Sequence, residues 1–469
     1  MSPSTRSVAL GLLLMSLLSF VAVGTASGRS PASVQVALGT RAVPQAARAT
    51  QTISASPFGA DIGFRTTEPT TGRVAYGLGE PTVWTAVSGP ATEHRVHLSG
   101  LRPGRTYKAV IDVVSADGRV GSTEVLVRTR PLPRSAAAGI AGGALTLDGE
   151  PFFPIFAFGQ CDTFDQSLDR GVNTFLLGGC RNENEAAEAR ELAGSALVAA
   201  STHWAASDVP GQIGHAYPDE ADEHGGTYES LPVLPSWQQS GKVSFLTLTN
   251  HFYSNADPLP QGKAMYPGLA RRADVLGFDL YPMQVWCRRS AFQHVYLAQR
   301  ELDALVKGRP TYQWIETRRM QCPQKGLAPT GTTLTAETWL AIAGGADGIG
   351  WFPWNPTTRS VSIAMRGLGE EIAALQPALL APELAAGATS GSGVYVGARQ
   401  LNGAIYVIAV NASRGPVSTS ISVSGLGSRS LRALFEPERV VTSSGGRFVD
   451  TFAPLQAHVY VSAPPLAAG

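Results

Sequence analysis

Eight short apolar runs, separated in several places by helix-like segments, occupy the middle of the chain. The runs cover residues 152–159, 173–179, 195–202, 213–220, 243–250, 275–282, 311–317 and 348–354. Helical patterns lie over residues 182–193, 293–307, 336–344 and 365–379. Strands that are apolar on both faces and alternate with helices require a parallel sheet covered by helices. Eight such units predict a (β/α)8 TIM barrel over residues 143–383.

A doubly wound parallel sheet is the competing fold for the same pattern. That fold places a glycine-rich phosphate loop after its first strand and gathers polar residues at one crevice. Here no such loop follows residues 152–159, and polar residues end many of the runs. The pattern therefore favours the barrel.

Alternating polar and apolar positions flank the barrel on both sides. Residues 51–133 read as short strands, and the segment LSGLRPGRTY resembles the tyrosine corner of fibronectin type III and related sandwich domains through Leu101, Pro103 and Tyr107. Residues 387–465 return to short alternating strands and predict a C-terminal β-sandwich. A small-residue linker is expected over residues 133–143. The fold class is therefore multidomain, a central barrel between two all-β sandwiches.

Charge and composition limit the classes of molecule that the chain is expected to bind. The 469 residues are enough for two to four domains, and Lys+Arg 37 against Asp+Glu 36 leaves a net charge of +1. No basic field points to nucleic acid or to anionic lipid. A hydrophobic share of 44% is ample for packed cores.

The first residues predict export. Arg6 precedes an apolar run over residues 8–23, and the small residues GTASG follow it. This order is typical of a secretory signal peptide over residues 1–27, cleaved near Ala26. An uncleaved anchor is the alternative, but the run is short for a membrane span. We expect a secreted, extracellular protein with no membrane attachment after cleavage.

Four cysteines fit an exported chain. An even number in such a chain suggests disulfides, and the barrel assignment selects one of the three possible pairings. Cys161 and Cys180 follow the first and second runs, whereas Cys287 and Cys322 follow the sixth and seventh. Loops after adjacent strands lie on one face, so we predict Cys161–Cys180 and Cys287–Cys322. No spacing of cysteine or histidine predicts a metal site.

Two carboxylates end two separate runs. Glu220 closes residues 213–220 and Glu316 closes the aromatic-rich residues 311–316. An ionised group at the tip of an apolar strand is costly unless it is paired or used. Active sites of these barrels lie at the C-terminal ends of the strands. A pair of carboxyl groups is also what most glycosidases use for catalysis.

Strand parity adds further candidates. Gly277, Asp279 and Tyr281 alternate with apolar residues on the sixth run, which predicts that this set faces the barrel interior. By the same parity Tyr312, Trp314 and Glu316 share one face of the seventh run.

These positions resemble the retaining glycoside hydrolases of clan A. The resemblance implies that Glu220 is the acid/base, that Glu316 is the nucleophile and that Tyr281 hydrogen-bonds the nucleophile. It also implies that Trp351 or Trp354 forms a floor on which a sugar stacks. The clan carries Asn before its acid/base, where this chain has Asp219. Parity leaves open which of Asp219 and Glu220 points inward, and Asp222 or Glu223 are further alternatives for the acid.

Other residues at the strand ends have two interpretations each. Sugar-binding candidates beyond the pair of acids are Asp219, Asp279, Tyr281, Asn250, His251, His203, Trp351 and Trp354. Asp279 is equally suited to an ion pair with Arg318 or Arg319. The Asn250–His251 pair is equally suited to loop capping. For Glu316 the structural alternative is a salt bridge to Arg318.

The expected function is hydrolysis of a neutral poly- or oligosaccharide with retention, without metal or organic cofactor. An inverting glycosidase that uses Asp219 or Asp279 with Glu316 is the alternative within enzymes. From another class, the chain is a carbohydrate-binding wall protein whose barrel lacks catalysis. The sequence leaves the sugar, its linkage and the oligomeric state open.

Overall fold

The computed structural model describes most of the chain from residue 51 onward. The described ranges are 51–178, 184–201, 209–224, 231, 241–324, 326–356, 358–384, 387–391, 393–436 and 438–466. The predicted signal peptide and its cleavage point near Ala26 lie outside them, as do Cys180 and His203.

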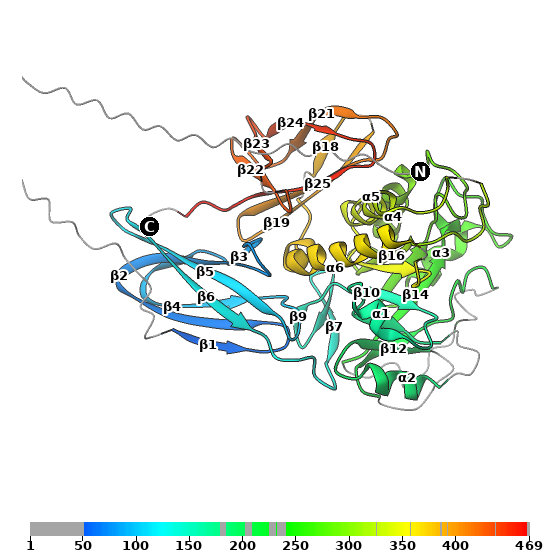
Figure 1. Cartoon of the computed structure of the whole chain (residues 1–469), viewed down its shortest axis with the longest axis horizontal. Helices are drawn as coiled ribbons and strands as arrows, with labels where there is room; N and C mark the ends of the chain where they lie inside the picture. Colours follow the sequence, from blue (N-terminus) through cyan, green and yellow to red (C-terminus); the bar gives the residue numbers. More distant parts are fainter. Residues whose placement is uncertain are drawn as a thin grey trace, which may run out of the picture. The chain divides into compact units, whose positions relative to one another are not determined.

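The N-terminal domain is a six-stranded antiparallel sheet (Figure 1). Its strands are β1 (Thr52–Ala55), β2 (Ala60–Gly77), β3 (Val83–Trp84), β4 (Ser88–Leu98), β5 (Thr106–Ser115) and β6 (Val120–Arg128). The long strand β2 pairs with β4 mainly through its first half and with β5 through its second, and the β2–β4 register shifts between Arg65 and Thr70. Pro69 lies in this shift, where a residue without an N–H group is tolerated.

Tyr107 makes the contact that its sequence motif predicts. The buried Tyr107 hydroxyl accepts a hydrogen bond from the Arg102 backbone N–H at 2.7 Å. This bond ties β5 to the loop before it, as in a tyrosine corner. The assignment to the fibronectin type III class stays a prediction.

A small sheet replaces part of the predicted linker. Strands β7 (Ala138–Ala141), β8 (Ala144–Leu147) and β9 (Glu150–Pro151) form a three-stranded antiparallel sheet. Small residues had suggested an unstructured connection over residues 133–143. The ladder Ala138↔Leu147 to Ala141↔Ala144 instead places Leu145 and Leu147 in a core beneath the barrel strands.

The barrel is closed and wholly parallel, as predicted. Its strands follow chain order: β10 (Ile155–Phe158), β11 (Thr174–Leu176), β12 (Leu197–Ser201), β13 (Gln212–Ala216), β14 (Val243–Thr249), β15 (Val275–Asp279), β16 (Thr311–Glu316) and β17 (Gly348–Phe352). Each lies within one of the eight predicted runs except for a one-residue extension of β13. The helices are α1 (Phe164–Leu168), α2 (Glu185–Leu192), α3 (Tyr266–Ala270), α4 (Gln293–Val306), α5 (Gly331–Ala343) and α6 (Arg359–Leu379), with short 3-10 turns η3 (Asn250–Phe252) and η4 (Lys263–Met265).

Aromatic rings set against glycines fill the barrel interior. Tyr312 and Trp314 on β16 point inward with Phe156 and Phe245, as strand parity predicts. A Cβ atom on Gly277 would lie 2.1 Å from the Tyr312 ring, and one on Gly350 would lie 2.1 Å from the Trp314 ring. The glycines therefore provide the space in which these rings lie.

The C-terminal domain consists of two facing sheets. Strands β18 (Ala388–Ser390), β21 (Val417–Val423) and β24 (Arg447–Phe452) form one, and β19 (Val394–Leu401), β20 (Ala404–Asn411), β25 (Ala457–Ser462), β22 (Ser430–Ala433) and β23 (Val440–Thr442) form the other. Buried residues of both sheets, among them Val407, Ile421 and Phe448, share one core. This arrangement agrees with the β-sandwich predicted here.

Gln376 joins helix α6 to the N-terminal sheet and to the connection that follows it. Its amide nitrogen donates to the carbonyls of Gly100, at 2.9 Å, and Pro151, at 3.1 Å. Its amide oxygen accepts from the Phe153 N–H at 3.1 Å, and the side chain is fully buried. One side chain thus satisfies three buried backbone groups.

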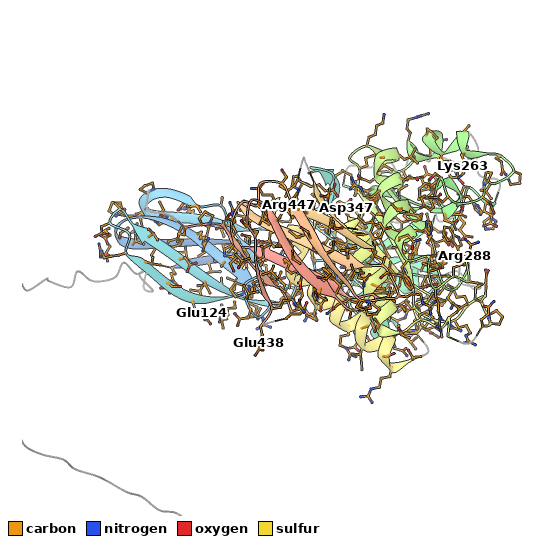
Figure 2. All side chains as sticks on the ribbon, turned by 90° about the horizontal axis from the view of Figure 1, so that it is seen from above. Glu124, Lys263, Arg288, Asp347, Glu438 and Arg447 are labelled. Carbon is orange, nitrogen blue, oxygen red and sulfur yellow. A yellow bond between two sulfur atoms is a disulfide. The ribbon has the colours of Figure 1, made fainter. Side chains whose placement is uncertain are left out.

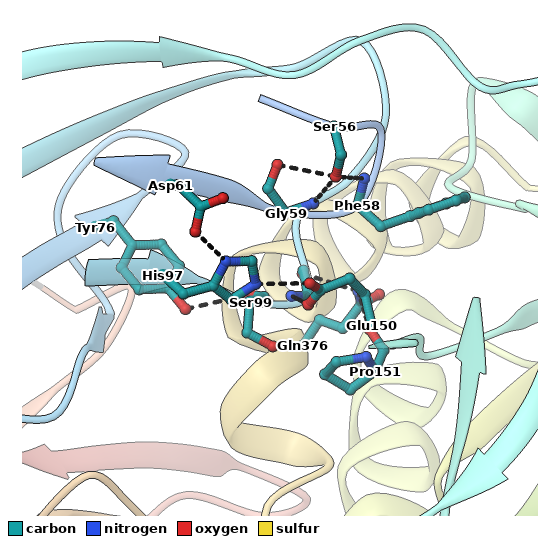
Figure 3. Close-up of polar contacts among 11 residues, drawn as sticks. Ser56, Phe58, Gly59, Asp61, Tyr76, His97, Ser99, Glu150, Pro151 and Gln376 are labelled. Atoms are coloured by element: carbon teal, nitrogen blue, oxygen red, sulfur yellow. Dashed lines mark hydrogen bonds and ion pairs between the residues drawn. The ribbon is translucent and has the colours of Figure 1, made fainter. Parts of the chain in front are cut away.

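His97 forms a second link between the N-terminal sheet and this connection (Figure 3). Its Nδ1 lies 2.9 Å from Asp61 and its Nε2 lies 2.6 Å from Glu150, the first residue of β9. Glu150 also accepts a bond from the Gly100 N–H. Partial burial lowers the pKa of His97, but the bonds to Asp61 and Glu150 outweigh it and raise the pKa overall.

We expect the ion pairs of His97 to stabilise the fold at low pH and to lose this contribution as the pH rises. Because the folded-state pKa is raised, the stabilisation is complete below the ordinary histidine value, about 6.5, and is lost as pH rises through the folded-state value. The melting temperature of the wild type should therefore exceed that of His97→Gln at low pH, and the gap should close on going to alkaline pH. A difference in melting temperature that does not change with pH would contradict the charged state of His97.

No helix among the described residues has the length and apolar character that a membrane crossing requires.

Candidate active site

Carboxyl groups from three neighbouring regions meet at the C-terminal mouth of the barrel. Strand β13 ends at Ala216, so Asp219 and Glu220 lie in the turn that follows it rather than on the strand. Asp279 is the last residue of β15, and Glu316 is the last residue of β16. The predicted acids therefore lie on the face where barrel enzymes place their chemistry.

Glu220 has an uncommon backbone conformation. Its φ is 46°, in the left-handed region. For a residue with a Cβ atom this conformation costs about 1–2 kcal/mol. Strain of this kind persists where the surrounding structure requires it, and such positions concentrate at functional sites.

The carboxyl groups of Glu220 and Asp279 are in hydrogen-bonding contact. A second carboxyl group in contact with Asp279 disfavours its ionised form. Burial, this contact and the charges of Glu220 and Asp219 raise the pKa of Asp279 well above its usual value. Burial and the charge of Glu220 also raise the pKa of Asp219 to about 6. The neighbour of Asp279 is thus an acid. The structural interpretation of Asp279 had been an ion pair with Arg318 or Arg319. Arg318 instead donates to Asn355 at 2.9 Å.

Tyr281 follows β15 and is influenced by four acidic side chains of the site. Its phenol is buried, and its pKa is raised first by burial and then by the charges of Asp279, Asp219, Glu220 and Glu316. One hydroxyl is therefore within electrostatic range of all four carboxyl groups. The Tyr281 ring stacks on Phe352 with centroids 5.8 Å apart.

Glu316 is fully buried, with 0% of its surface exposed. Its two carboxylate oxygens accept hydrogen bonds from the backbone N–H groups of Met283, at 3.0 Å, and Gln284, at 2.8 Å. Glu316 is thus held by backbone donors. The structural interpretation of this residue had been a salt bridge to Arg318. Burial raises the pKa of Glu316, although the two backbone donors oppose the shift.

The loops after β15 and β16 are fastened to each other. Gln284 accepts from the Met320 N–H at 2.6 Å and donates to the Leu327 carbonyl at 2.5 Å. The predicted disulfide Cys287–Cys322 is present, with Cα atoms 5.5 Å apart. Cys161 is also disulfide-bonded. Its predicted partner, Cys180, lies outside the described residues.

Asp222 has a structural role. It is fully buried and accepts hydrogen bonds from the Thr249 N–H at 3.0 Å, the Thr249 hydroxyl at 2.6 Å and the Tyr266 hydroxyl at 2.9 Å. These three donors tie the turn after β13 to β14 and α3. As an alternative acid Asp222 is therefore poorly placed, and Glu223 is exposed to solvent.

Trp351 is not a sugar platform, which corrects one prediction. Its side chain is 0% exposed, packs in the core between the barrel strands and the helices, and donates to the Arg170 carbonyl. The parity of β17 explains the error, because Gly350 and Phe352 face inward and Trp351 between them faces outward. Phe352 is partly exposed at the mouth instead. Trp354 is partly exposed as well, and its contact with sugar stays a prediction.

Asn250 and His251 form the short turn η3 after β14. The Thr249 hydroxyl caps the His251 N–H, and the His251 ring contacts the Asp257 carbonyl through Nδ1 at 2.6 Å. These contacts fit the loop-capping interpretation, and substrate contact by either residue stays a prediction. His203 lies outside the described residues. The described part of the chain contains no cluster of three His, Cys, Asp or Glu side chains placed to hold a metal ion.

Sequence reasoning overlooked Glu337. This residue lies on α5, is 1% exposed, and its carboxyl group is in hydrogen-bonding contact with that of Glu316. Burial and the charge of Glu316 raise its pKa well above the usual value. The signal in the sequence was a lone acid within the otherwise uncharged segment LTAETWLAIAGGA.

No family model matches the chain, and no curated protein matches it. Among solved structures, the chain is similar to a β-D-glucuronidase from Dictyoglomus thermophilum (TM-score 0.35, 9% identity, 68% of each chain covered). It is also similar to a GH30 endoxylanase from Clostridium papyrosolvens (0.38, 14%, 70% of this chain and 98% of that one) and to an Anoxybacillus α-amylase (0.40, 12%, 65% and 90%). At these scores the similarity carries no functional argument, so the site must supply it.

Proposed function

We propose that the chain is a secreted glycoside hydrolase that cleaves a neutral poly- or oligosaccharide with retention. Glu220 is the acid/base and Glu316 the nucleophile. The observation that supports this most is that Asp219, Glu220, Asp279 and Glu316 all lie within electrostatic range of Tyr281 at the mouth of a closed parallel barrel.

The first step of the reaction needs one carboxyl group that donates a proton and one carboxylate that attacks as the nucleophile. Glu220 delivers its carboxyl proton to the leaving oxygen as the glycosidic C–O bond breaks, and Asp279, whose pKa is raised, stays protonated beside the new Glu220 carboxylate. A Glu316 oxygen forms the new bond to the anomeric carbon. Glu220 then takes a proton from water, which attacks the same carbon and releases Glu316 as a carboxylate. The two backbone N–H groups on Glu316 stabilise that carboxylate.

The burial of Glu316 favours a second assignment. Asp219, Glu220 and Asp279 are all partly exposed at the mouth, whereas Glu316 is not. In an inverting reaction Asp279 or Asp219 would activate water, and Glu316 would remain an anchor for the loop after β15. The carboxyl groups of an inverting pair stand about 6.5–9.5 Å apart. A barrel that binds carbohydrate without cleaving it is the alternative outside enzymes.

The test is a screen of plant and microbial wall polysaccharides with the wild type, Glu316→Gln and Asp279→Asn. The anomeric form of the first product, followed by NMR, separates retention from inversion. Retention with an inactive Glu316→Gln supports the proposal. Inversion, or equal turnover by Glu316→Gln, contradicts it. Saturable sugar binding with no product from any substrate identifies a binder.

A further inference from the structure

Two buried carboxyl groups in contact, Glu316 and Glu337, form a pair whose role the proposed reaction does not explain. Glu316 ends β16 and Glu337 lies on α5, the helix that follows it. Both side chains are at most 1% exposed. A buried acid costs several kcal/mol unless it is neutral or paired, and no cation of the described residues is among the groups that act on Glu337.

Two negative charges in contact in such a site cannot coexist, so the pair retains one proton. The surroundings decide which partner holds it. Glu316 accepts two backbone N–H bonds, which favour its anion. On Glu337 the backbone donor is a single N–H group, that of Glu316, so its anion is favoured less than the Glu316 anion. The proton therefore belongs on Glu337.

We infer that Glu337 is a positioning residue for Glu316: its carboxyl group stays protonated and donates that proton to the Glu316 carboxylate. Glu316 is then held as an anion by three donors, two from the loop after β15 and one from α5. The raised pKa of Glu337 agrees with this arrangement. Among the described residues, Tyr281, which follows β15, lies within electrostatic range of Glu316.

The inference rests on the proposed function only where it concerns activity. The protonation of Glu337 is a property of the folded chain that can be measured without substrate. Its consequence for the reaction depends on Glu316 acting as the nucleophile.

Infrared difference spectra of the wild type and Glu337→Gln at about pH 8 test the protonation, because ordinary carboxyl groups are ionised there. We expect a carboxylic-acid C=O band in the wild type that Glu337→Gln lacks and Glu337→Asp retains. Absence of that band from the difference would overturn the inference. Glu337→Asp keeps the measurement possible if Glu337→Gln folds poorly.

The pH profile of kcat tests the positioning role. In Glu337→Gln the amide donates to Glu316 without any competition for a proton, so the acid limb of the profile should move to lower pH with KM nearly unchanged. Asp347→Asn is the matched control. Asp347 is a half-buried acid whose pKa is also raised by burial, to about 7, but it precedes β17 at the opposite end of the barrel from the loop that carries Arg288 (Figure 2).

An unchanged acid limb in Glu337→Gln, or an equal shift in Asp347→Asn, would overturn the positioning role. Full activity of Glu316→Gln would instead overturn the proposed function. The infrared result does not depend on that outcome and still decides whether Glu337 holds the proton.

Discussion

Replacing Glu220 by Gln should lower kcat on unactivated oligosaccharides by about 10²–10⁴-fold, the usual contribution of general acid catalysis. Gln cannot deliver a proton to the leaving oxygen. Aryl glycosides with good leaving groups need little protonation, so their first step should lose much less. The measurement is kcat for both substrate types across pH, with the product followed directly.

Two further variants separate chemistry from folding at this position. Glu223→Gln makes the same chemical change in the same turn at an exposed side chain, and it should leave kcat unchanged. Glu220→Gly removes the carboxyl group but accepts a φ of 46° without a Cβ penalty, so it should be inactive yet at least as stable as the wild type. Turnover of oligosaccharides by Glu220→Gly at the wild-type rate would contradict the role of Glu220.

Gly277→Ala should lower the free energy of unfolding by at least about 3 kcal/mol, at the upper end of the cost of overpacking. The added Cβ would lie 2.1–2.3 Å from atoms of the Tyr312 ring. That ring cannot move aside easily, because its hydroxyl bonds Thr247 at 2.7 Å and its face packs on Phe156 at 4.7 Å. Urea unfolding monitored by tryptophan fluorescence measures the loss.

The interior packing also predicts non-additivity. Tyr312→Ala alone leaves a cavity, but in combination with Gly277→Ala it removes the clash, so the double variant should be more stable than the sum of the two losses predicts. Gly89→Ala is the control, since a Cβ there meets no atom within 4 Å. A fully additive double variant would show that the ring and the glycine do not compete for space.

The barrel could be predicted from the sequence because its strands are recognisable by their length and apolar composition. Apolar runs such as VSFLTLTN and VLGFDLYP are too apolar for exposed strands and too short for buried helices, and both became barrel strands. Tyr312 and Trp314 face the barrel interior, as the parity of β16 predicts. The same argument applied to β17 would have turned Trp351 outward.

The candidate site was less predictable because contacts between loops decide it. Nothing near Glu316 in the chain shows that its partners are the N–H groups of Met283 and Gln284, or that Glu337 reaches it from the next helix. The contact between Glu220 and Asp279 depends on how the turn after β13 bends, which φ at Glu220 controls. Likewise, the predicted linker over residues 133–143 gave no sign of the strand Ala138–Ala141, which forms only by pairing with β8.

The hydrogen bonds of Gln376 bear on how this protein can be divided. A shortened chain that begins at the barrel would lose the Gly100 carbonyl that this amide serves, and Arg102, which donates to the Phe153 carbonyl. The Tyr406 hydroxyl of the C-terminal sandwich would likewise lose the Thr82 carbonyl. Segments that look separable along the chain are thus one unit for expression, and an isolated barrel is a poor starting point for engineering.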